Sequence, residues 1–301
     1  MFSENLIVNI DDLLNEEYKF YAHTNENSKE TLQEHTNRCI KYFNAIIKEK
    51  ELESIFQNFI DLWFSEHQIS YGQLFFELII NTIVFHDLGK INPLFQSIKM
   101  KNSLFSKENG DITLGSDHSI VSAILYLEFF LTKCMNFPKE IRDRFMLLTY
   151  VNAYVISKHH GNLDRFGKFL DAFNEEDSNY RYFTELIEVN YKNYFKQNSI
   201  ILDVKNCVRC VRSVIEHEGT CYEDSIALYA YEKLIYSLLV ASDFYATAEY
   251  NNNFILVSHG NIEEIHKIRE TFDNTNINQN IEEYRKIKYY DKEKNLKDVK
   301  D

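Results

Sequence analysis

Apolar residues recur along this chain at spacings that are typical of helices. Segment 74–85 is apolar at nearly every position, which predicts a helix buried on all sides. A second helix is expected to begin at the capping-box pattern of residues 31–34, and the apolar spacing that follows turns His35 toward the interior. Both segments predict a helical core.

Further helices are expected from Ser116 or Asp117, from Pro138 to Ile156 and from Tyr222 to Tyr250. Segments 254–257 and 6–8 are short apolar runs that could pair as strands. The 301 residues include only 8 Gly and 2 Pro, so the signals of loops and hairpins are sparse. We therefore predict an all-α helical bundle with a short two-stranded ribbon. It should form one domain over residues 1–273, and the polar segment 274–301 should be a tail or linker.

Composition and net charge limit the cellular compartments and the partners to be expected. Five cysteines without a framework spacing favour a reduced, cytoplasmic compartment. No apolar run free of charges is long enough to span a bilayer, so no membrane partner is expected. The net charge of −13 argues against a broad basic surface for nucleic acid. A nucleic-acid substrate would have to be drawn in locally or delivered by a partner.

A His86-Asp87 doublet lies where the most apolar helix should end, and Gly89 is expected to end that helix in a left-handed conformation. A carboxylate near the interior is costly unless it is paired or binds a metal. Other residues of this kind lie at helix ends or inside apolar helices: His35, His118, His159, His160 and Asp243. For His118, at a helix start, the helix dipole favours the neutral imidazole that binds metal.

Imidazole and carboxylate ligands together suit divalent transition metals such as Mn, Fe, Co, Ni or Zn. The set contains no cysteine, which argues against a structural zinc site. Seven ligands exceed what one ion needs, whereas two ions that share Asp87 would use them all. Such a pair would suit phosphodiester hydrolysis.

The order of these residues resembles the HD nuclease domain of the CRISPR type I interference nuclease-helicase. The resemblance rests on His35, the His86-Asp87-x-Gly89-Lys90 segment, His118, the His159-His160-Gly161 segment and Ser242-Asp243, with support from Phe95-Gln96. It extends from Asn25 to Tyr250.

This resemblance implies that Asp87 and Lys90 act in catalysis, Lys90 by contacting the phosphate. One metal would be held by His35, His86, Asp87 and Asp243, and the other by Asp87, His118, His159 and His160. It also implies cleavage of single-stranded DNA with two divalent transition metal ions (Mn, Fe, Co or Ni). The partners would be a helicase domain or subunit and a guide-RNA interference complex. No phosphate-binding loop of the G-x-x-x-x-G-K-[ST] type is present, so the sequence given has no helicase of its own.

Two other functions stay open. One is an HD-superfamily phosphohydrolase that acts on nucleotides or cyclic dinucleotides, and the other is a non-catalytic helical module that docks a partner. The remaining histidines are expected at the surface: His23, His67, His217, His259 and His266. Cys207 and Cys210 have zinc-like spacing without a second pair, which favours ordinary helix cysteines.

Overall fold

The computed structural model describes residues 2–64, 69–105, 118–171, 191–196 and 222–252, together with scattered positions between 266 and 286. The described chain is mostly helical and contains a short two-stranded antiparallel sheet, so the predicted all-α class with a ribbon is confirmed. The longer helices are α2 (Leu32–Glu49), α3 (Glu53–Trp63), α4 (Ile69–Phe85), α5 (Ser119–Cys134), α6 (Lys139–Lys158) and α10 (Tyr222–Asn252). Shorter elements are η1 (Glu4–Leu6), α1 (Ile10–Leu13), β1 (Tyr21–Thr24), β2 (Lys29–Thr31), η2 (Leu88–Ile91), the π-helix η3 (Phe95–Lys99), α7 (Phe166–Asp171) and η6 (Lys192–Tyr194).

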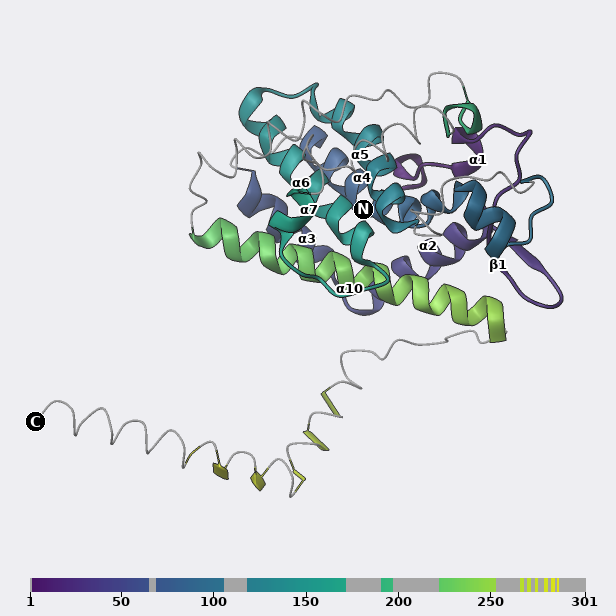
Figure 1. Cartoon of the computed structure of the whole chain (residues 1–301). Coiled ribbons are helices and arrows are strands. Elements are labelled where there is room, and N and C mark those ends of the chain that lie inside the picture. The colour runs from purple at the N-terminus through teal and green to yellow at the C-terminus, as the bar shows by residue number, and fades with distance from the viewer. Residues whose placement is uncertain are drawn as a thin grey trace, which may run out of the picture. The chain divides into compact units, whose positions relative to one another are not determined.

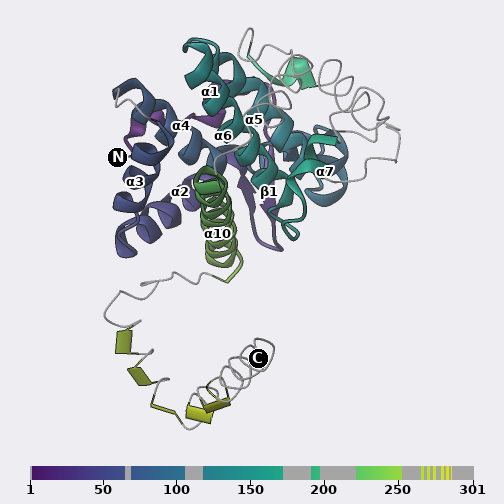
Figure 2. The ribbon, with the colours of Figure 1, turned by 90° about the vertical axis from the view of Figure 1, so that its left-hand side faces the viewer.

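Helix α4 lies at the centre of the bundle, in contact with α2, α5, α6 and α10 (Figure 1). Every residue from Leu74 to Phe85 except Glu77 is buried, as expected for a helix with apolar side chains on all faces. The long helix α10 crosses one side of the bundle, and the view along its axis in Figure 2 places it beside α2. This packing directs the C-terminal end of α4 into the middle of the molecule.

A chain of buried hydrogen bonds connects four of these helices. The Tyr126 hydroxyl on α5 donates to the carbonyl of Leu78 on α4, and the amide of Asn152 on α6 donates to that hydroxyl. Tyr231 on α10 donates in turn to the side-chain oxygen of Asn152 at 2.8 Å. Because each group has a partner, the chain fixes how the helices align without leaving a buried polar group unsatisfied.

The predicted start of α2 is confirmed. The Thr31 side chain accepts from the backbone N–H of Glu34, and the Glu34 side chain accepts from the backbone N–H of Thr31, which completes the capping box. Thr31 is also the last residue of β2, so the ribbon leads into α2 without a loop. Its opposite strand is held by Gln96, whose side chain bonds both backbone groups of Tyr21 and the carbonyl of Lys90.

The ribbon does not lie where the sequence suggested. Residues 6–8 end a 3-10 turn and form no strand, while 254–257 lie outside the described residues. The observed pair joins β1 to β2, with His23 opposite Glu30. Its strands carry few apolar residues. Hydrogen bonds from the Gln96 side chain, in a distant part of the chain, hold the strand at Tyr21 instead.

Gly89 also differs from expectation. Helix α4 ends at Phe85, and Gly89 follows in η2 without a left-handed backbone. A Cβ atom at Gly89 would lie 2.1 Å from the carbonyl oxygen of His118 and 2.8 Å from the backbone nitrogen of Ser122. The glycine is therefore required by the close approach of α5 and not by the end of α4.

The contacts divide the chain into two compact units, Met1–Leu256 and Val257–Asp301. The predicted boundary after residue 273 stays a prediction, because few positions nearby are described. Among the helices that the structure describes, none combines the length and apolar composition that crossing a membrane requires.

Candidate metal centre

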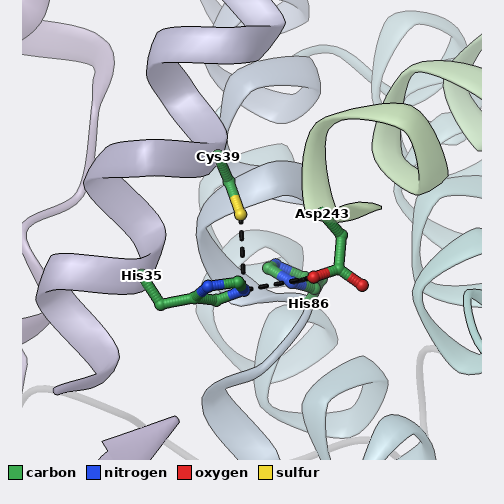
Figure 3. Close-up of side chains that lie close together, drawn as sticks. All are labelled: His35, Cys39, His86 and Asp243. Atoms are coloured by element: carbon green, nitrogen blue, oxygen red, sulfur yellow. Dashed lines mark hydrogen bonds and ion pairs between the residues drawn. The ribbon is translucent and has the colours of Figure 1, made fainter. Parts of the chain in front are cut away.

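The seven histidines and aspartates singled out in the sequence come together in the core of the first unit. Together with Cys39 they form two groups of four potential ligands, and within each group the ligand atoms lie within 4.8 Å of one another; a third such group, His23, Glu30 and His35, shares His35 with the first. The first group contains His35, Cys39, His86 and Asp243 (Figure 3), and the second contains Asp87, His118, His159 and His160. Helix α2, the ends of α4 and α6, the start of α5 and the middle of α10 supply them. Buried groups of this composition are positioned to hold a metal ion.

Asp87 connects the two groups. Its Oδ2 lies 3.3 Å from His35 Nε2 and 3.6 Å from His86 Nε2. Its Oδ1 lies 3.0 Å from His118 Nε2 and 3.7 Å from His159 Nε2. One oxygen of the carboxylate therefore faces each group, as the prediction of a shared Asp87 requires.

His86 and His159 are oriented by the same local contact. Each follows the last residue of a helix, and each Nδ1 donates to a carbonyl three residues earlier, Ile83 in one case and Ile156 in the other. The donor position is thus fixed at Nδ1, and Nε2 keeps its lone pair. Among the described residues, neither Nε2 atom has a hydrogen-bond partner, although both are buried. Two unpartnered lone pairs thus point into the centre.

In the first group, the lone pair of His86 therefore faces a carboxylate oxygen of Asp243, and both atoms are hydrogen-bond acceptors. His86 Nε2 lies 3.7 Å from Asp243 Oδ1, which is itself 3.2 Å from His35 Nε2. Burial alone would raise the pKa of Asp243, but the neighbouring imidazoles of His35 and His86 hold it well below its usual range. Asp87 behaves alike: burial opposes its charge, but the Lys90 ammonium and the surrounding histidines keep its pKa well below the usual value. Converging carboxylates and imidazole lone pairs favour a bound cation.

The second group opens toward solvent. His160 is exposed, and its Nε2 lies 3.0 Å from that of His118. Burial lowers the pKa of His118. Although His160 is exposed as a whole, desolvation of its ring and the neighbouring His159 lower its pKa to about 4. Both imidazoles are therefore neutral at neutral pH. For His118 the cause is burial rather than a place in the first helical turn, since α5 begins at Ser119 with His118 as its cap residue. The expected caps at 116 and 117 lie outside the described residues.

The structure adds a cysteine, Cys39, to the residues that could hold a metal. Cys39 is fully buried on α2, one turn after His35, and its Sγ lies 3.4 Å from His35 Nε2. Burial raises the pKa of the thiol to about 11. Its spacing of four from His35 already placed it on the inward face of the helix. Its distance from ligands on other helices could not be derived from that spacing.

Glu30 and His23 were also missed. Glu30 is buried on β2, with its Oε2 at 2.8 Å from His23 Nδ1 and 3.5 Å from His35 Nδ1. Burial would raise the pKa of Glu30, but the hydrogen bond from His23 and the nearby imidazole of His35 lower it to about 2. His23, expected at the surface, is in fact half-buried beside His35, whereas His266 is exposed as expected. A carboxylate behind Nδ1 orients the opposite nitrogen of His35 toward the centre.

Lys90 lies inside the centre instead of at its open edge. Its Nζ is 2.6 Å from Asp87 Oδ2 and 3.3 Å from the carbonyl oxygen of Ala22, and only 4% of the residue is exposed. The ammonium therefore offsets the negative charge of the shared carboxylate. Contact of Lys90 with a phosphate stays a prediction.

Five other residues considered in the sequence lie outside the described residues: Cys207, Cys210, His67, His217 and His259.

In comparisons with known proteins, no family model, no curated protein and no solved structure matches this chain. The geometry of the two ligand groups is therefore the main evidence for a function.

Proposed function

We propose that the chain is a metal-dependent phosphodiesterase that cuts single-stranded DNA, with two divalent transition metal ions (Mn, Fe, Co or Ni). The observation that supports this most strongly is the position of Asp87 between the two ligand groups, with one oxygen directed at each. Paired metals that share a carboxylate recur in enzymes that hydrolyse phosphate esters. The order of the ligand residues along the sequence, which resembles the HD nuclease domain, supports the same function.

When bound, the two ions would lower the pKa of an attacking water and stabilise the charge on the phosphate. The protein supplies the ligands in fixed orientations. His86 and His159 each present a lone pair that a backbone hydrogen bond has already directed inward. Lys90 holds a positive charge 2.6 Å from Asp87, in the interior where its field is screened less than at the surface.

Charge and access are consistent with delivery of the substrate by partners. Asp243 and His160 are the least buried of the ligands, so the substrate would approach from their side. Of the lysines and arginines near the histidine pair, Lys158 is paired with Asp164 at 3.3 Å, whereas Arg165 and Lys168 are exposed. With a net charge of −13, intrinsic affinity for DNA would be weak. We propose that a helicase and a guide-RNA complex present the strand, in the cytoplasm.

Digestion of circular single-stranded DNA tests this proposal. We expect the metal-free protein to be inactive, and the protein reconstituted with Mn, Co, Ni or Fe to cut the circle. An Asp87→Asn variant should stay inactive, while Asp12→Asn, which changes an exposed aspartate on α1, should cut like the wild type. Circular substrate excludes cleavage that depends on a free end.

Parallel reactions with nucleotides and cyclic dinucleotides separate the alternatives. Turnover of these small molecules without cleavage of DNA would replace the nuclease by a nucleotide phosphohydrolase. If metal binds but no substrate turns over, the proposed enzyme is wrong, and a helical docking module becomes the better explanation.

Metal affinity should fall as the pH is lowered, and the first group should lose its metal at a higher pH than the second. Burial would lower the pKa of His35, but Cys39, Asp243 and Glu30 raise it well above its usual value, so a proton competes with metal even near neutral pH. The lowered pKa values of His118 and His160 remove this competition from the second group. Each proton displaced costs up to about tenfold in affinity per pH unit.

Competitive metal titrations between about pH 5 and pH 8, centred near the unperturbed histidine value, would measure this. Affinities that do not change with pH, or a second group that empties first, would contradict the assignment of ligands.

A further inference from the structure

The first group contains the sulfur atom of Cys39, which is not among the ligands that the resemblance to HD nucleases implies. We propose that Cys39 binds the metal of this group through Sγ, so that the two metal sites differ chemically: one has a thiolate ligand and the other has only nitrogen and oxygen ligands. This inference depends on the proposed metal centre but not on DNA cleavage.

Two distances within the first group fit coordination of one ion, while the 3.7 Å from His86 Nε2 to Asp243 Oδ1 is longer than the same geometry gives. With bond lengths of about 2.3 Å to sulfur and 2.05 Å to nitrogen, ligand atoms lie about 3.1 Å apart at a right angle and about 3.6 Å apart in a tetrahedron. The distance from Cys39 Sγ to His35 Nε2 is 3.4 Å, within this range. His35 Nε2 and Asp243 Oδ1 are 3.2 Å apart, which fits the slightly shorter range expected for nitrogen and oxygen.

A second observation, independent of the cysteine, points to an ion at the same place. The buried Nε2 of His86 has no hydrogen-bond partner in the described chain, and it belongs to the same group of converging atoms. Figure 3 shows Cys39 and Asp243 reaching His35 from different helices, with His86 beside them. A simple hydrogen bond between Cys39 and His35 would not explain the unpartnered nitrogen of His86.

Coordination by sulfur has a chemical consequence. The thiol loses its proton to solvent as the metal–sulfur bond forms, so the ligand is a thiolate. Thiolate favours Fe(II), Co(II) or Zn(II) over the harder Mn(II) and Mg(II), while the second group keeps a preference set by imidazole and carboxylate. The first group should therefore discriminate more strongly between metals.

Cobalt substitution tests the proposal without any measurement of cleavage. Metal-free protein is titrated under reducing conditions with up to two equivalents of Co(II), and its absorption spectrum is recorded. We expect a near-ultraviolet charge-transfer band from thiolate to cobalt in the wild type. Cys39→Ser should lose this band, bind cobalt at the first group at least about tenfold more weakly and still bind cobalt at the second group.

Control variants assign the band. Cys134→Ser changes a buried cysteine that bonds to Phe130 and Thr149 away from the ligand groups, and it should keep the band. The triple replacement of Cys207, Cys210 and Cys221 by serine should also keep it. Circular dichroism confirms that each variant is folded, and Cys39→Ala replaces Cys39→Ser if that variant does not fold.

The outcomes distinguish this proposal from the nuclease. Cobalt binding without the band, or a band that persists in the Cys39 variant, would overturn the sulfur ligand while the nitrogen and oxygen centre remains. A wild type that binds no cobalt would overturn the metal centre and the sulfur ligand together. A band in a protein that does not cut DNA would support Cys39 and refute the nuclease.

Discussion

Asp87→Asn should remove both metals and lower the rate of DNA cleavage by at least about a thousandfold. The carboxylate supplies one oxygen to each ligand group, at 3.3 Å from His35 and 3.0 Å from His118, so no other single ligand affects both. A thousandfold lower rate corresponds to the loss of about 4 kcal/mol of transition-state stabilisation. This loss lies within the several kcal/mol that bound metal ions provide. Metal content per chain and single-turnover cleavage rates are the measurements.

Asp243→Asn is the matched control, because Asp243 belongs to the first group alone. It should bind one equivalent of metal where the wild type binds two and Asp87→Asn binds none. Equal metal content in the two variants would show that Asp87 does not join the groups. Thermal unfolding of each variant separates loss of metal from loss of structure.

Gly89→Ala should destabilise the fold by about 3 kcal/mol or more, at the upper end of what overpacking costs. The new Cβ would lie 2.1 Å from the carbonyl oxygen of His118, and that carbonyl accepts the hydrogen bond from Ser122 N at 2.8 Å. Relief of the clash requires movement of the backbone, so α5 must shift away from η2. For a domain of this size, the melting temperature should fall by roughly 6–12 °C.

Gly72→Ala is the control for this substitution. Gly72 lies in α4 with nothing within 4 Å of a Cβ, so alanine there should raise stability by roughly 0.5–1 kcal/mol. Metal-free protein is used for both, so that metal binding does not contribute. If Gly89→Ala melts at the wild-type temperature, the close approach of α5 is wrong.

The helices and most candidate ligands could be predicted from the sequence because the signals that specify them are local. The capping box at Thr31, the apolar run of α4 and Pro138 before α6 each act within a few residues. His35 lies on the inward face for the same reason. The histidines and aspartates of both groups could be selected because they lie at helix ends or within apolar helices.

Other features depend on contacts between distant segments and could not be predicted. The ribbon that carries Glu30 is held by Gln96, 75 residues from its partner Tyr21. The role of Gly89 arises from α5, and periodicity places Cys39 inward without showing what lies opposite. In each case the decisive distance joins two elements whose packing is not encoded in local spacing.

In the proposed metal centre, the helix-end contacts of His86 and His159 would set the order of folding and metal binding. Each ring is held by a carbonyl only three residues away, so these two ligands take their final direction as soon as α4 and α6 form. The entropy of ordering them is lost during folding and not when an ion arrives. Folding and metallation can therefore be separate events, with occupancy set by the concentration of free metal around an already folded chain.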